Sequence, residues 1–171
     1  MHLFKEHSKW TGQLAEEYSA AFSADFDPGQ RFVALSLRFR NLDEDRSTTR
    51  TRLAISDYIS EILLDFDNRI LGDAEFRGDC RTSVMTSVDK LKSVRNWNAN
   101  IILQVAWTRK SSYEDVMTSL HSSIRDREEN NKIQLYQTDI EELDWEKSVL
   151  SIAGINLNTL DGSNTFLAKY K

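Results

Sequence analysis

Five arginines lie within fifteen positions of one another, and they are the side chains best suited to bind phosphate groups. Arg38 and Arg40 end the alternating apolar stretch 31–40, and Arg46, Arg50 and Arg52 follow it. Contacts between such side chains and phosphates dominate affinity for nucleic acids. Three acidic residues at 43–45 offset part of this charge, and the one alternating aromatic, Phe39, is predicted to face the core rather than a base. The pattern favours a solvated or ion-paired strand face, with a protein contact and a nucleic-acid contact as alternatives.

Side chains for nucleophilic catalysis are few. The three histidines, His2, His7 and His121, lie near a terminus or beside an apolar helical stripe. Neither a G-x-S-x-G elbow nor a phosphate-binding G-x-x-x-x-G-K loop occurs. Cys80 lies near Arg77 and Arg81, whose charge can activate a thiol, but an inert thiol is the favoured interpretation. We therefore predict no catalytic residues, and a non-enzymatic protein is favoured.

Carboxylates gather at 139–146, where oxygen ligands for Ca²⁺ or Mg²⁺ are available. The residues are Asp139, Glu141, Glu142, Asp144 and Glu146. The glycine and the spacing of an EF-hand loop are absent, and no cysteine pair or H-E-x-x-H motif occurs elsewhere. A solvated acidic loop is favoured, so we expect no metal and no cofactor.

Aromatic residues beside polar ones offer a different kind of site, because exposed aromatics are enriched at protein interfaces. Trp97 and Trp145 have polar neighbours, and aromatic stripes occur near both ends of the chain. Segments 1–26 and 158–171 are therefore predicted to be possible arms for association with other chains. The predicted partner-binding residues are Phe4, Trp10, Trp97, Trp145, Phe166 and Tyr170.

Several segments have the periodicity of regular structure. Residues 31–40 and 100–107 alternate as strands, and the second is apolar enough on both faces to be central in a sheet. Residues 132–137 and 148–157 are further strands, and the acidic stretch 138–147 joins them. Helices are predicted over 1–24, over 111–131 with a Ser111–Glu114 capping box, and over a stripe that stops at Gly72. That stripe comprises Ile55, Tyr58, Ile59, Ile62, Leu63, Phe66 and Ile70. Residues 73–99 fit a helix or a strand.

Length and order of the elements predict a single α+β domain over 1–171. The 171 residues suit one domain with its own core. We expect a mostly antiparallel sheet with two to three helices packed on it, and a ferredoxin-like split βαβ core is one arrangement that fits. No run of 18 apolar residues occurs, so we expect no membrane contact. The charged N-terminus is unlike a signal peptide and the single cysteine fits a reducing compartment, so we expect a cytoplasmic location or an intracellular assembly.

Taken together, these patterns predict a non-enzymatic structural or interaction protein. It would associate with itself or with protein partners, or form part of a larger macromolecular assembly such as a virus particle. The alternative is a nucleic-acid-binding module that uses the Arg38–Arg52 strand and loop. The net charge of −5 counts against this alternative, because non-specific nucleic-acid binders usually carry a basic surplus.

Overall fold

The computed structural model describes residues 31–42, 47–72, 82–91, 95–105, 112–127, 132–143 and 159–165. Their elements are, in chain order, β1 (Arg31–Asn41), α2 (Thr48–Leu71), β2 (Ser83–Lys90), β3 (Asn96–Val105), α4 (Tyr113–Arg125), β4 (Ile133–Leu143) and the short 3-10 helix η2 (Gly162–Asn164). The predicted helix over 1–24, the possible arm 1–26 and the predicted strand over 148–157 lie outside the described residues.

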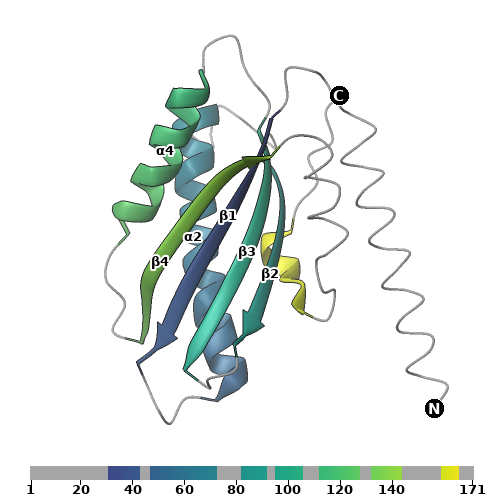
Figure 1. Cartoon of the computed structure of the whole chain (residues 1–171), viewed down its shortest axis with the longest axis vertical. Coiled ribbons are helices and arrows are strands. Elements are labelled where there is room, and N and C mark those ends of the chain that lie inside the picture. Colours follow the sequence, from purple (N-terminus) through teal and green to yellow (C-terminus); the bar gives the residue numbers. More distant parts are fainter. Residues whose placement is uncertain are drawn as a thin grey trace, which may run out of the picture.

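The four strands form one antiparallel sheet in the order β2-β3-β1-β4, with α2 and α4 on one of its faces (Figure 1). The predicted α+β class is confirmed. The element order β-α-β-β-α-β, with β3 between β1 and β2, is the order of a split βαβ arrangement. The narrower ferredoxin-like assignment stays a prediction. Strand β3 is central, as its apolar sequence indicated.

The core lies between the sheet and the helices, and the alternation in β1 explains how it forms. Val33, Leu35, Leu37 and Phe39 are all nearly or fully buried and belong to the core cluster. Their neighbours Arg38 and Arg40 are exposed on the opposite face, because successive side chains of a strand point to opposite faces. The two predicted faces of this strand are confirmed.

Helix α2 buries the predicted apolar stripe against this sheet, and both of its ends are capped. The Ser47 hydroxyl accepts a hydrogen bond from the Arg50 N–H at 3.3 Å. Gly72 ends the helix with φ of 85°, a value that favours glycine, and its N–H bonds to the Asn68 carbonyl at 3.0 Å. The predicted stop at Gly72 is therefore confirmed.

Helix α4 is attached to α2 through charged side chains near its C-terminal end. Arg69 of α2 binds Asp65 at 2.7 Å and Asp126 at 3.1 Å, and Arg127 pairs with Glu61. The Arg127 guanidinium also lies 5.3 Å from the centre of the Tyr58 ring. Burial raises the pKa of Tyr58, and the nearby Arg127 charge opposes this shift.

The start of α4 differs by one residue from the predicted capping box. Ser112, not Ser111, is the N-cap, and its partner is Asp115, not Glu114. The Asp115 carboxylate accepts from the Ser112 N–H at 2.9 Å and from its hydroxyl at 2.8 Å. Because the sequence has two adjacent serines and two adjacent acids, it allows the capping box in either of two registers. The helix takes the register that places Val116 and Leu120 in the core.

This cap should make stability depend on pH. Hydrogen bonds from the backbone and hydroxyl of Ser112 hold the pKa of Asp115 below its ordinary value. A depressed carboxyl pKa stabilises the fold above the unfolded-state pKa, and the effect is lost as the pH falls through the folded-state pKa. We expect Asp115→Asn to lower the free energy of unfolding at neutral pH, with the deficit shrinking as the pH falls below the ordinary aspartate pKa of about 3.9. Urea denaturation at neutral and at acidic pH measures both values. A deficit that is equal at the two values would contradict this role.

One segment that the sequence left ambiguous is resolved, and another differs from the prediction. The ambiguous stretch 73–99 contains β2 and the start of β3. Residues 139–143, the first part of the acidic stretch, belong to β4, so the prediction of a loop was wrong there. The strand continues because Ile140 faces the core and pairs with Leu35 of β1.

Among the helices of the described ranges, none combines the length and apolar character needed to span a bilayer.

Candidate interaction surface

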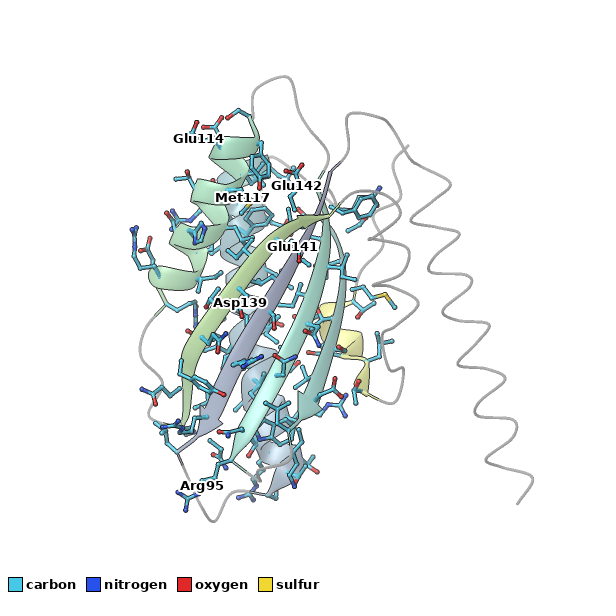
Figure 2. The ribbon with its side chains drawn as sticks, in the orientation of Figure 1. Arg95, Glu114, Met117, Asp139, Glu141 and Glu142 are labelled. Carbon is cyan, nitrogen blue, oxygen red and sulfur yellow. The ribbon has the colours of Figure 1, made fainter. Side chains whose placement is uncertain are left out.

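The sheet face opposite the helices is exposed over the strands β1 and β4. We call this region the β1–β4 surface (Figure 2). Seven side chains lie on this surface. Each belongs either to the residues of β1 and β4 that point away from the core or to the β-bulge in β4. Farther along the same side, Phe32, Met85 and Ile102 are buried, so the exposed area is confined. The β1–β4 surface comprises Arg38, Arg40, Gln134, Tyr136, Gln137, Asp139 and Glu141.

Hydrogen bonds between side chains order this surface. The Arg38 guanidinium donates to the Gln137 Oε1 at 3.3 Å, and the Gln137 Nε2 donates to the Asp139 carboxylate at 2.8 Å. A second chain of bonds lies beside it on β1 and β3. There Ser36 donates to Asn98 at 3.0 Å, and Asn98 donates to Asn100 at 3.0 Å. The polar side chains therefore form rows across three strands.

One aromatic ring belongs to the surface. Tyr136 is 42% exposed, and the Arg40 guanidinium lies over its ring, 5.3 Å from the centroid. A β-bulge produces this contact, because Arg38 pairs with Gln137 while the next residue, Phe39, pairs with Leu135. The extra residue, Tyr136, has no direct partner on β1. Such cation–π contacts at exposed sites contribute about 0.5–1 kcal/mol.

Charge is distributed unevenly along the two strands. Arg40 lies near the end of β1, where that strand pairs with the start of β4. Asp139 and Glu141 occupy the other half of β4 (Figure 2). Arg40 and these two acids make the β1–β4 surface basic at one end and acidic at the other. Other exposed charges lie near the same ends, namely Lys90, Arg95 and Lys132 at the first and Glu142 and Glu114 at the second. Lys90 and Glu142 belong to core-side rows and Glu114 to α4, so these three are not part of the surface.

The structure separates the five arginines of the sequence motif. Arg38 and Arg40 lie on the β1–β4 surface, whereas Arg50 and Arg52 belong to α2, in the other layer. Arg52 donates to the Leu160 carbonyl at 3.2 Å. Arg46 lies outside the described residues. The described arginines therefore do not form one continuous basic groove.

Of the six predicted partner-binding residues, the structure describes only Trp97. Its side chain is 2% exposed and belongs to the core cluster, so the exposure expected from its polar neighbours is absent. The register explains this, since Trp97 pairs with Phe39 on the core face. The other five lie outside the described residues and are Phe4, Trp10, Trp145, Phe166 and Tyr170. Cys80 also lies outside them.

Part of the segment 158–171, predicted as a possible arm, is held against its own chain. Asp161 donates from its backbone N–H to the Thr86 carbonyl at 2.8 Å, and Ser87 forms an antiparallel bridge with Leu160. These contacts lie along β2, at one edge of the sheet. On the other side, η2 packs against α2 through Asn164. Residues 159–165 therefore close the β2 edge.

Sequence reasoning missed most of the β4 members of the β1–β4 surface. The sequence places Tyr136 and Gln137 in a predicted strand without a role, and Asp139 and Glu141 in a predicted loop. The signal was the strand alternation of 132–137, which continues through Ile140. Within the described ranges, no group of three or more metal-ligating side chains is close enough to hold an ion.

No family model, curated protein or solved structure matches this chain.

Proposed function

We propose that this protein is a non-enzymatic structural or interaction protein that associates with itself or forms part of a larger macromolecular assembly. The observation that carries the proposal is the β1–β4 surface. It is exposed, confined to two strands, and occupied by ordered polar side chains and one aromatic ring. Packing within the described chain does not use it.

The composition and order of this surface suit protein contacts. Arginine and tyrosine are enriched among the residues that contribute most to binding energy. Arg38 and Arg40 are already held by Gln137 and Tyr136. Side chains fixed before association lose less conformational entropy when they bind, which strengthens the complex. The paired arginines thus present donors and a stacked ring in a fixed geometry.

Nucleic-acid binding is a second candidate, and the Arg40–Tyr136 stack favours it. Bases stack on exposed aromatic rings and on guanidinium planes, and Arg38 lies next to this pair. The separation of Arg50 and Arg52 from this surface counts against it, as does the net charge of −5. We therefore keep protein association as the first proposal.

Light scattering during gel filtration, with and without single-stranded RNA and DNA, separates the two candidates. We expect the full chain to elute with a mass above its 19.8 kDa monomer, unchanged by nucleic acid. Arg38→Glu with Arg40→Glu should reduce that mass. Arg50→Glu is the matched control, because Arg50 is exposed on α2.

Two results would overturn the first proposal. One is a chain that stays monomeric at every concentration. The other is a complex with nucleic acid that the Arg38→Glu, Arg40→Glu pair abolishes and Arg50→Glu retains. The second result would make nucleic-acid binding the function.

A further inference from the structure

The two edges of the sheet differ. The β2 edge is covered by residues 159–165, through the Ser87–Leu160 bridge and a bond of 3.3 Å from the Thr86 N–H to the Thr165 hydroxyl. At the other edge, β4 pairs only with β1 among the described strands. An edge strand of eleven residues without proline is long, and its outward backbone groups form a template for another strand.

We infer that two copies of this chain pair through their β4 edges, antiparallel and related by a two-fold axis at Thr138. The inference rests on the proposed self-association and names the β4 edge, which borders the β1–β4 surface, as the place of contact. The sheets of the two copies would then continue as one eight-stranded sheet. An interface of this kind uses the same patch twice, so the patch must complement itself.

The charge pattern of β4 meets this requirement. Thr138 is the midpoint of the strand Ile133–Leu143, and Asp139, Glu141 and Glu142 all lie in its second half. Antiparallel pairing about Thr138 places this acidic half beside the first half of the second copy. That half has no acidic residue before position 138.

The register on β1 extends the complementarity. The bulge places Tyr136 and Gln137 together opposite one residue of a facing strand, so Asp139 faces this pair and Glu141 faces Gln134 of the second copy. In that copy, Arg38 pairs with Gln137 and Arg40 with Gln134. Each acid therefore lies in one row with an arginine two strands away, at about 10 Å between Cα atoms. An arginine and a glutamate side chain together span this distance.

Other registers satisfy the charges less well. A shift of the axis by two residues towards Leu143 places Asp139 opposite Glu141 on the same face, and like charges directly opposite are destabilising. A shift of the axis towards Ile133 leaves the acidic end of the strand, with Glu141 and Glu142, without a facing strand. The same acids that select Thr138 as the centre also discourage unspecific pairing of this edge, as charged residues on edge strands commonly do.

Disulfide trapping tests the position of the axis. Residues opposite each other in an antiparallel pair have Cα atoms about 4.5–5.5 Å apart, within reach of a disulfide. We expect full-length Cys80→Ser, Thr138→Cys to form a covalent dimer in mild oxidant within minutes. Cys80→Ser, Leu53→Cys is the control, because Leu53 is 59% exposed on α2. This control should form at least about tenfold less covalent dimer, because only random collisions would bring two thiols at position 53 together.

A charge exchange tests the register without a cysteine. Glu141→Arg and Arg40→Glu should each weaken dimerisation by about tenfold, since the two-fold axis repeats every contact and the loss per contact is a fraction of 1.4 kcal/mol. The double variant should recover most of this loss. Sedimentation velocity of all four proteins measures the dissociation constants, and circular dichroism verifies that each is folded.

The outcomes separate this inference from the proposed function. A dimer that is neither trapped at Thr138 nor sensitive to residues 40 and 141 would overturn the β4 pairing and leave self-association by another surface. A Cys80→Ser chain that is monomeric throughout would overturn both. Trapping together with recovery in the double variant would support both.

Discussion

Replacing Phe39 with alanine is expected to lower the free energy of unfolding by about 3–5 kcal/mol. Phe39 is fully buried between β1 and α2, and its ring meets the Tyr58 ring edge-on with centroids 5.4 Å apart. The exchange removes apolar contacts on both layers and leaves a cavity that two regular elements can fill only in part. Urea denaturation followed by circular dichroism measures the loss.

Two further variants calibrate this result. Phe39→Leu keeps most of the volume and should lose less than the alanine variant. Leu53→Ala, at a side chain 59% exposed on α2, should change stability by no more than about 0.5 kcal/mol. If Phe39→Ala lost as little as Leu53→Ala, the ring of Phe39 could not be packed between β1 and α2.

Asn164→Leu is expected to lower the free energy of unfolding by about 2–4 kcal/mol, because it removes four hydrogen bonds at a buried site. The Asn164 Nδ2 donates to the Ser56 carbonyl at 2.8 Å, to the Ser56 hydroxyl at 3.1 Å and to the Asp161 carboxylate at 2.7 Å. The Ser60 hydroxyl donates to its Oδ1 at 2.7 Å. Leucine leaves these groups buried without partners, so residues 159–165 should separate from α2 and β2.

Asn164→Asp is the sharper companion variant. It keeps the shape but replaces the donor with a carboxylate next to Asp161, so it should destabilise by a similar amount at neutral pH. The loss should shrink in acid, when a carboxyl can again donate. Ser163→Ala, at an exposed neighbour, should have little effect. Equal stability of Asn164→Asp and the unmodified chain at neutral pH would contradict the network.

The elements with a clear period were predictable from the sequence. Helix α2 shows its buried stripe and its glycine stop because its apolar side chains recur every three or four residues. Strand β1 shows two faces because one faces the core and the other the solvent. The β2 strand was ambiguous for the opposite reason. Residues 83–88 are buried on both faces, so no polar alternation marks them as a strand.

What the sequence could not supply is pairing at long range. Trp97 has polar neighbours in the chain, yet its register opposite Phe39 buries it. Tyr136 meets Arg40 only because a bulge in β4 shifts the register by one residue. The β1–β4 surface therefore joins residues almost a hundred positions apart. The predicted arms and the arginine motif rested on neighbours in the chain, and the structure separates Arg38 and Arg40 from Arg50 and Arg52.

Sedimentation equilibrium of the full chain over a wide range of concentrations is the decisive experiment for self-association, because it measures mass without a label or a matrix. We expect a mass that rises with concentration from 19.8 kDa towards twice that value, or beyond it if the chain assembles further. We also expect a weaker rise in Glu141→Arg. A mass that stays at 19.8 kDa at the highest concentration would show that the protein does not act by associating with itself.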